Sequence, residues 1–169
     1  FRTHGITREE KYLSKNDGPW YYEQIDLGYN YRITDIQCAL GVSQMDKLDG
    51  FVAKRRTLVE RYNKAFENIS EIVTPKQVDG CNNSYHLYVI QVNNRLDVFN
   101  KLRAAGIGVN VHYIPVYKHP YYQKNGYDKV YCPNAEDYYE HCISLPLYPK
   151  LTIEEQDYVI DKVIDAVKR

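Results

Sequence analysis

The sequence lacks an excess of charge of either sign, because 22 lysine and arginine residues are balanced by 22 aspartate and glutamate residues. A chain without net charge has no general field that attracts a polyanion, which disfavours a nucleic-acid coat and a membrane-surface protein. Long apolar runs are also missing: runs such as residues 87–90 stay far below the roughly 18 residues needed to cross a bilayer. No targeting sequence is visible. We therefore expect a cytoplasmic protein with neither a nucleic acid nor a membrane among its partners.

Paired cysteines and familiar catalytic sequences are absent as well. The four cysteines lie at irregular separations without a Cys-x-x-Cys sequence, so neither a zinc site nor a disulfide framework is indicated. His112 and His119 have no carboxylate at a spacing that would complete a metal site, and we predict no metal. There is no Walker loop, no Gly-x-Gly-x-x-Gly and no Gly-x-Ser-x-Gly. From the residues alone, no side chain can be identified as a catalytic nucleophile.

What is present is one domain's length of chain, 169 residues, with a hydrophobic fraction of 44% and 18 tyrosines. This composition disfavours intrinsic disorder. The chain begins at Phe1 and its only methionine is Met45. We therefore interpret the chain as a segment of a longer protein. Residues 1–33 show no helical period and contain the turn sequence Asp17-Gly18-Pro19, so we expect a loop-rich arm.

Helical spacing begins at Thr34. The sequence Thr34-x-x-Gln37 is typical of a capping box, and apolar residues then recur at helical intervals from Ile36 to Ile69. We predict a long leading helix or a broken pair. The break is expected at Asp49-Gly50, because glycine costs about 1 kcal/mol in a helix interior.

The rest of the chain predicts a small sheet covered by helices. Strands are expected over residues 85–92, 107–113 and 142–145, and the first two would form a β-α-β unit with the helix between them. The predicted helices are residues 95–105, capped by Asn94 and ended by Gly106; residues 133–139; and a last helix capped by Thr152-x-x-Glu155 with Val159, Ile160, Val163, Ile164 and Val167 on one face. Residues 115–133 are expected to be a long aromatic loop. The fold class is α/β (α+β): a long helix, then a sheet of few strands.

The segment from Gly28 to Arg32 lies just before the capped helix and is a candidate anion site. Main-chain N–H groups and the helix dipole favour a negative charge at such a position. Asn30 offers an amide donor and Arg32 a forked guanidinium, both good phosphate contacts. A solvated turn that merely enters the helix remains the alternative.

His112 is the second candidate. It lies on the polar face of the predicted strand 107–113, beside Tyr113, and a histidine can act near neutral pH; a structural histidine is the alternative. Nine of the tyrosines fall between Tyr113 and Tyr148. Such side chains stack on a nucleobase and bond a sugar, and they equally suit an interface, so both interpretations stay open.

Five segments occur in an order typical of one family. They are residues 2–5 (Arg-Thr-His-Gly), 28–41 (Gly-Tyr-Asn-Tyr-Arg-Ile-Thr-Asp-Ile-Gln-Cys-Ala-Leu-Gly), 84–88 (Ser-Tyr-His-Leu-Tyr), 111–117 (Val-His-Tyr-Ile-Pro-Val-Tyr) and 143–146 (Ile-Ser-Leu-Pro). With these the chain resembles the C-terminal part of the DegT/DnrJ/EryC1/StrS family of sugar aminotransferases, which are pyridoxal phosphate (PLP) enzymes of fold type I. Residues 111–117, 121–123 and 135–139 are most similar to the UDP-4-keto-sugar aminotransferases of pseudaminic acid biosynthesis.

The resemblance implies a domain organisation. Residues 1–33 would be an arm that continues from a preceding PLP domain, and residues 34–169 would form the C-terminal small domain with its long leading helix. The Schiff-base lysine, the aspartate on the pyridine nitrogen and the aromatic residue on the cofactor ring would all precede Phe1. We therefore expect this chain alone to be inactive.

The resemblance also implies an activity. The enzyme would transfer an amino group from L-glutamate to a keto nucleotide sugar, in the biosynthesis of cell-surface polysaccharide or glycan sugars, with PLP as cofactor. It would act as a homodimer in which Asn30 reaches the PLP phosphate of the neighbouring subunit. Arg32, His112 and Tyr113 would line the substrate side. The alternative function is a non-catalytic module that binds a nucleotide sugar or a protein partner.

Overall fold

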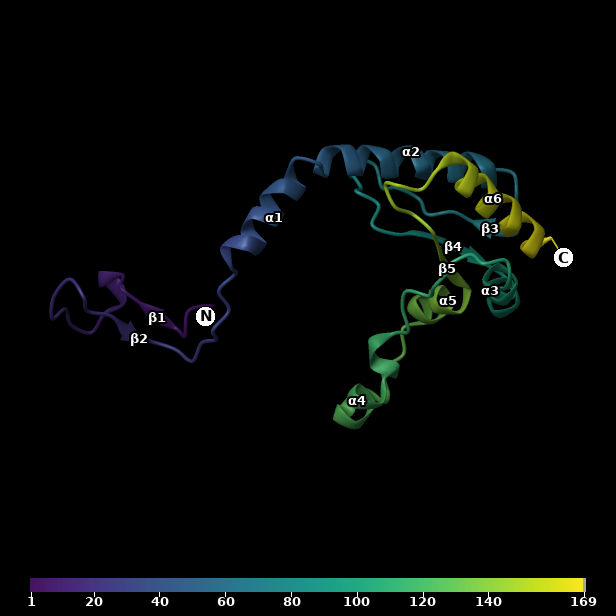
Figure 1. The fold of residues 1–169 in the computed structure, drawn as a ribbon. Coiled ribbons are helices and arrows are strands. Elements are labelled where there is room, and N and C mark those ends of the chain that lie inside the picture. Colours follow the sequence, from purple (N-terminus) through teal and green to yellow (C-terminus); the bar gives the residue numbers. More distant parts are fainter. Residues whose placement is uncertain (169) are drawn as a thin grey trace. The chain divides into compact units, whose positions relative to one another are not determined.

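The computed structural model describes residues 1–168 and divides into two compact units, Phe1–Leu48 and Asp49–Arg169 (Figure 1). The second unit contains the sheet with most of the helices, and the two are described one at a time. The domain boundary expected between residues 33 and 34 stays a prediction.

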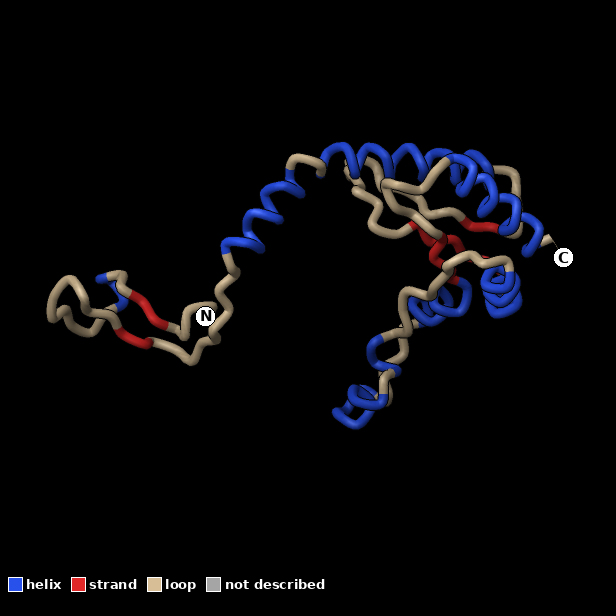
Figure 2. Tube along the Cα trace, viewed as in Figure 1, coloured by secondary structure: helices blue, strands red, loops and turns tan. Residues whose placement is uncertain are grey.

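The first unit begins with a small hairpin. Strand β1 (Ile6–Thr7) pairs antiparallel with β2 (Glu23–Gln24), and a single 3-10 turn, η1 (Glu10–Tyr12), lies between them. The remaining chain up to Thr34 is loop, drawn in tan in Figure 2. The Glu23 carboxylate organises this loop, because it accepts hydrogen bonds from the main-chain N–H of Ser14 and the hydroxyl groups of Ser14 and Tyr21.

Helix α1 (Asp35–Met45) ends the first unit. Thr34 accepts from the main-chain N–H of Gln37 while the Gln37 side chain accepts from the N–H of Thr34, so the predicted capping box is confirmed. None of the eleven residues of α1 is buried. Its apolar side chains, such as Ile36 and Leu40, are exposed within this unit.

Helix α2 (Leu48–Phe66) follows after a break at Asp46-Lys47, where the N–H of Lys47 bonds to the carbonyl of Gln44. The predicted break at Asp49-Gly50 is wrong, because Gly50 lies in the first turn of α2. A glycine there costs about 1 kcal/mol, which is less than the helix gains by burying its apolar face against the sheet. The buried residues on that face are Leu58, Val59, Tyr62 and Phe66.

The sheet of the second unit has three antiparallel strands in the order β3-β4-β5. They are β3 (Ile72–Val73), β4 (Tyr88–Val92) and β5 (Cys142–Leu145). The strand predicted over residues 142–145 is confirmed, and β4 is shorter at its start than the predicted 85–92 because Tyr85 has a φ of 49°. The short β3 was not predicted.

The predicted β-α-β unit is wrong, since residues 107–113 form no strand. The N–H of Val109 bonds to the carbonyl of Ile107, a tight three-residue turn that takes both groups out of any ladder. One isolated bridge, Asn110 to Ser144, joins the segment to β5. The alternation of side chains still holds at its start, where Ile107 and Val109 are buried.

Helices cover the sheet as predicted. They include α3 (Arg95–Ala104), α5 (Pro133–His141) and α6 (Ile153–Val167). Asn94 does not cap α3 with its side chain, contrary to expectation. It adopts the left-handed conformation, in which its main-chain carbonyl accepts instead. Gly106, with a φ of 77°, ends α3 as predicted.

The segment predicted as a long aromatic loop contains short helical turns. They are η2 (Val116–Lys118), α4 (Pro120–Tyr122) and η3 (Gln123–Tyr127). Tyr122 lies edge-on to Tyr121 and to Tyr127, with ring centroids 5.4 and 5.9 Å apart. No residue of these turns is buried.

The core of the second unit is formed by the sheet with helices α2, α3 and α6, of which α2 and α6 run side by side in Figure 1. Tyr62 of α2 stacks on Tyr88 of β4 with ring centroids 4.8 Å apart, and Phe66 stacks on Tyr62. Helix α6 contributes the predicted face, with Val159, Ile160 and Val163 buried. Among residues 1–168 no helix is long and apolar enough to cross a membrane.

Candidate functional site

The Asn30 segment is held against the start of the chain by main-chain hydrogen bonds. The N–H groups of Tyr29 and Tyr31 donate to the carbonyls of Phe1 and Arg2, at 2.7 and 2.9 Å. The close approach needs a glycine at position 28, since a Cβ there would lie 2.1 Å from the main-chain nitrogen of Gly5. The position of Asn30 is therefore fixed by its backbone.

The side chains of Asn30 and Arg32 are both exposed. Asn30 lies five residues before the first residue of α1, on the N-terminal side of that helix. An amide, a guanidinium and the free N–H groups of a helix start are donors of the kind that a phosphate dianion requires. This donor set fits the phosphate group of PLP.

His112 and Tyr113 lie in the second unit, just beyond the bridge between Asn110 and Ser144. The His112 ring is partly buried and makes two hydrogen bonds, one from each nitrogen. Nδ1 lies 2.7 Å from the hydroxyl oxygen of Ser144, and Nε2 lies 3.2 Å from the amide nitrogen of Asn110. Tyr113 packs edge-on to His112 and is 68% exposed, so one face of this pair is open to a ligand.

Sequence reasoning missed Asn110 and Ser144 as partners of His112. Ser144 is 4% exposed and lies in an otherwise apolar strand. A hydroxyl in such a strand was the available signal, because a buried polar group has to find a hydrogen-bond partner. The structure thus brings His112 and Tyr113 together with two unforeseen residues. Asn30 and Arg32 lie near each other in the first unit.

Glu136 of α5 makes hydrogen bonds to the tyrosine-rich segment, residues 115–133. Its carboxylate accepts from the hydroxyl of Tyr117 at 2.9 Å and from the ammonium group of Lys118. The Tyr117 hydroxyl in turn accepts from the N–H of Cys132, at 3.3 Å. The two ends of the segment are thus joined, while Tyr121 and Tyr131 remain 71% and 70% exposed.

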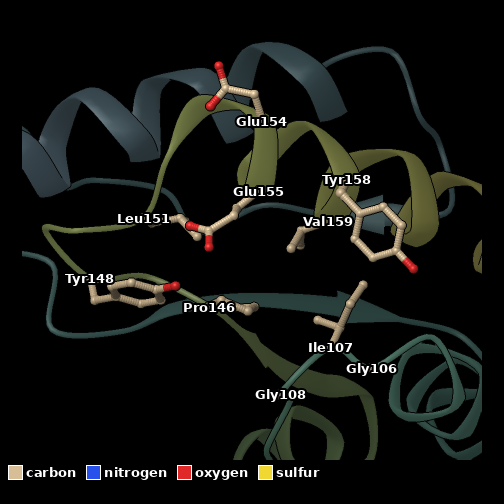
Figure 3. Close-up of a pocket in the computed structure, with 10 residues that line it drawn as sticks. All are labelled: Gly106, Ile107, Gly108, Pro146, Tyr148, Leu151, Glu154, Glu155, Tyr158 and Val159. Carbon is tan, nitrogen blue, oxygen red and sulfur yellow. The ribbon is translucent and has the colours of Figure 1, made fainter.

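A separate pocket of about 630 Å³ opens between the loop after α3, the loop after β5 and the first turns of α6 (Figure 3). Its walls include Ile107, Leu151 and Val159. The Glu155 carboxylate is turned toward the other lining residues, whereas that of Glu154 points away. None of the four residues predicted to contact cofactor or substrate lines this pocket.

Metal ligands do not converge in the part of the chain that the structure describes: no group of three His, Cys, Asp or Glu side chains is placed to hold an ion. Two electrostatic features lie elsewhere. Hydrogen bonds from Ser14 and Tyr21 lower the pKa of Glu23 to about 2, and burial raises the pKa of the Cys142 thiol.

Solved structures of sugar aminotransferases share this fold. Helicobacter pylori PseC, an aminotransferase involved in the biosynthesis of pseudaminic acid, superposes with a TM-score of 0.84 at 28% identity, over 99% of this chain and 44% of that one. The putative sugar aminotransferase Spr1654 from Streptococcus pneumoniae, in its PMP form, gives a TM-score of 0.85 at 30% identity, over 98% and 41%. Spr1654 has also been solved in a PLP form. The fold therefore belongs to the class of sugar aminotransferases.

Sequence relatives define the family. The model of the DegT/DnrJ/EryC1/StrS aminotransferase family matches residues 1–164, and the chain belongs to this family. The spore coat polysaccharide biosynthesis protein SpsC of Bacillus subtilis is 39% identical over 98% of this chain. A UDP-4-amino-4,6-dideoxy-N-acetyl-beta-L-altrosamine transaminase of Campylobacter jejuni is 32% identical over 99%. The chain spans 44% of the length of each of these two relatives. The resemblance drawn from the five segments is confirmed.

Proposed function

We propose that this chain is part of a cytoplasmic, PLP-dependent aminotransferase that moves the amino group of L-glutamate to a UDP-linked 4-keto sugar. The product would serve the biosynthesis of cell-surface polysaccharide or glycan. The observation that carries the proposal is the relation to the Campylobacter jejuni transaminase, which extends over 99% of the chain. All four residues assigned to the site lie within that extent.

The cofactor would be bound through its phosphate. When bound, PLP supplies the electron sink on which amino transfer depends. Asn30 would donate from its carboxamide to a phosphate oxygen, and α1 would add the favourable field of its N-terminus. The exposure of the Asn30 side chain supports this role, because no packing competes for the amide.

Arg32 and the pair His112 and Tyr113 would each make a different kind of contact with the substrate. The Arg32 guanidinium suits the diphosphate of a nucleotide sugar, since its fork can donate two parallel bonds to phosphate oxygens. His112 and Tyr113 would contact the sugar ring. The exposed face of Tyr113 is an apolar surface on which a pyranose can lie, and its hydroxyl can bond the ring substituents.

The active enzyme would be a homodimer, with Asn30 serving the cofactor of the neighbouring subunit. Helix α1 supports this part of the proposal. Ile36, Leu40 and Met45 are exposed by 84%, 63% and 65% in the described chain. A helix that is apolar on several sides is normally buried, so a second subunit that covers α1 would remove this surface from water.

The cofactor role of Asn30 is tested in the intact enzyme by Asn30→Ala. PLP retention should fall about tenfold or more on dialysis, which corresponds to the loss of one charge-assisted hydrogen bond of about 1.5–3 kcal/mol. Asn82→Ala is the matched control, because Asn82 is also exposed and lies in the second unit. Unchanged PLP retention in Asn30→Ala would remove this residue from the site.

The reaction itself is tested by incubating the intact enzyme with L-glutamate and a panel of UDP-linked 4-keto and 3-keto sugars. Formation of 2-oxoglutarate with a 4-keto sugar is the expected result. Arg32→Ala should raise KM for the nucleotide sugar, while Arg103→Ala, an exposed arginine of α3, should not. Turnover with none of the sugars would refute the proposed activity.

A further inference from the structure

His112 is connected to β5 through the one bridge that its segment makes. The N–H of Ser144 donates to the carbonyl of Asn110 at 2.8 Å, and the N–H of Asn110 donates back to the carbonyl of Ser144 at 3.3 Å. These two bonds are made by main-chain atoms only. The side chains of Asn110 and Ser144 are therefore free to act on the ring of His112, which lies two residues further along.

The orientation of the Asn110 amide is set by its neighbour. The N–H of Val111 donates to Oδ1 of Asn110 at 2.8 Å, so the Oδ1 atom is on the side of the main chain. The amide nitrogen Nδ2 is then the atom that lies 3.2 Å from Nε2 of His112. An amide nitrogen carries two hydrogens and cannot accept, so it must be the donor in this contact.

This orientation determines which ring nitrogen carries the proton. Because Nε2 accepts from Asn110, it has no hydrogen, and the ring proton is on Nδ1. Nδ1 then donates to the hydroxyl oxygen of Ser144, which lies 2.7 Å away. The opposite tautomer would place the Nε2 hydrogen against an amide hydrogen of Asn110. A doubly protonated ring would create the same clash.

We propose that Asn110 and Ser144 are positioning residues that hold His112 as its neutral Nδ1–H tautomer and keep the lone pair of Nε2 as a hydrogen-bond acceptor. Asn110 is exposed, so its amide is an exchangeable partner, whereas Ser144 is 4% exposed and is a fixed one. A hydroxyl group of the bound sugar replaces the Asn110 amide and donates to Nε2. This last step rests on the proposed function.

The consequence is a selectivity that a charged histidine would not give. A neutral acceptor recognises a hydroxyl or an amide N–H of the sugar and offers nothing to a carboxylate or a phosphate. In the proposed enzyme, Arg32 would bind the anionic part of the substrate. His112 would recognise an uncharged substituent of the sugar ring. A sugar that lacks a donor at that position cannot replace the Asn110 amide, so it makes one hydrogen bond fewer and binds more weakly.

The tautomer is measured by nitrogen-15 NMR of the histidine rings in the ligand-free protein at neutral pH, with the His112 signal assigned from His112→Gln. The expected result is a proton on Nδ1 of His112. His141 supplies an internal reference, because its Nδ1 lies 2.7 Å from the main-chain carbonyl of Asp137, which can only accept. A proton on Nε2 of His112 would overturn the proposal.

Two variants test the cause. Asn110→Asp replaces the donor with a carboxylate, which should move a proton onto Nε2 without touching the main-chain bridge. Asn100→Asp, an exposed asparagine in α3, should leave the His112 spectrum unchanged. If Asn110→Asp leaves the proton on Nδ1 alone, the side chain of Asn110 does not set the tautomer and the proposal is refuted.

The substrate step has its own readout. In the intact enzyme, Ser144→Ala and Asn110→Asp should each raise KM for the keto sugar about fivefold, the effect of one neutral hydrogen bond, with kcat changed less. Ser144→Thr retains a hydroxyl and should restore both the Nδ1–H signal and KM. The expected tautomer together with an unchanged KM would support the positioning of His112 and refute its part in the proposed function.

Discussion

Gln156 of α6 donates a hydrogen bond from its Nε2 to the main-chain carbonyl of Leu58 in α2, at 2.7 Å, and its side chain is fully buried. The other end of the same amide accepts from Nε of Arg61 at 2.9 Å. One polar side chain therefore joins α2 to α6.

Removing the Gln156 amide should destabilise the second unit. Gln156→Leu leaves Nε of Arg61 without its partner, and we expect the free energy of unfolding to fall by about 1–3 kcal/mol. Urea denaturation followed by circular dichroism measures the change. Asp161→Asn, an exposed position on α6, is the control and should stay within about 0.5 kcal/mol of the unaltered protein. Equal stability of Gln156→Leu would show that the amide link contributes nothing.

The capping box of α6 gives a second prediction. Thr152 accepts from the N–H of Glu155 at 3.1 Å, and the Glu155 carboxylate accepts from the N–H of Thr152 at 2.9 Å. Thr152→Ala should cost about 1 kcal/mol of unfolding free energy, whereas Thr152→Ser keeps the hydroxyl and should cost far less. A thermal melt of the two variants compares them directly. Indistinguishable melting temperatures would contradict the capping role.

Gly28 gives a prediction that combines structure and proposed site. A Cβ at position 28 would lie 2.1 Å from the main-chain nitrogen of Gly5 and 2.6 Å from the carbonyl oxygen of Phe1. Gly28→Ala must therefore displace the Asn30 segment, and we expect PLP retention by the intact enzyme to fall at least as far as in Asn30→Ala.

The control for Gly28 is Gly50→Ala in α2, a helix that belongs to the second unit except for its first residue. No atom lies within 4 Å of a Cβ built there, and alanine favours a helix over glycine by about 1 kcal/mol. This variant should retain PLP and be no less stable. Normal PLP retention in Gly28→Ala would mean that the tight pairing of residues 1–5 with residues 28–31 does not position the cofactor contact.

The loop around Glu23 should respond to acid. Hydrogen bonds from Ser14 and Tyr21 lower the pKa of Glu23 to about 2, so the folded loop favours the charged carboxylate. The stabilisation is complete above the ordinary pKa of a glutamate, about 4.3, and is lost as the pH falls from there toward 2. Fluorescence of Trp20, the one tryptophan of the chain, reports on this loop.

We expect the Trp20 signal to change between about pH 4 and pH 2 in the unaltered protein. Glu23→Gln cannot ionise, so this variant should lose the acid transition attributable to that carboxylate. Glu10→Gln is the control, because Glu10 is an exposed carboxylate of the same hairpin. An identical acid transition in Glu23→Gln would assign the change to another group.

Much of the fold could be predicted because it depends on local chemistry. Two capping boxes, the end of α3 at Gly106 and the apolar face of α6 are each determined by a few neighbouring residues. The prediction of a strand at residues 107–113 is wrong because the alternation of apolar and polar residues indicates only which side chains are buried. Whether a segment pairs is decided by distant chain, and here the turn at Ile107 leaves one bridge to Ser144.

The sequence predicts candidate site residues, but it does not predict the contacts that their side chains make. Asn30 and His112 are candidates because of their residue types and because they lie beside a helix start and a predicted strand end. The partners of His112 come from a bridge between residues 34 positions apart, which no local pattern encodes. The helix break predicted at Asp49-Gly50 is wrong for a related reason. The burial of one face of α2 outweighs the weak helix preference of a single glycine.

The uneven distribution of aromatic residues has a practical consequence. Trp20 belongs to the first unit, whereas the stacked and buried pair Tyr62 and Tyr88 belongs to the second. Tryptophan fluorescence and the near-ultraviolet circular dichroism of packed tyrosines therefore follow different units of the same molecule. Coincident melting of the two signals would indicate one cooperative transition, and separate melting would give each unit its own stability from a single unlabelled sample.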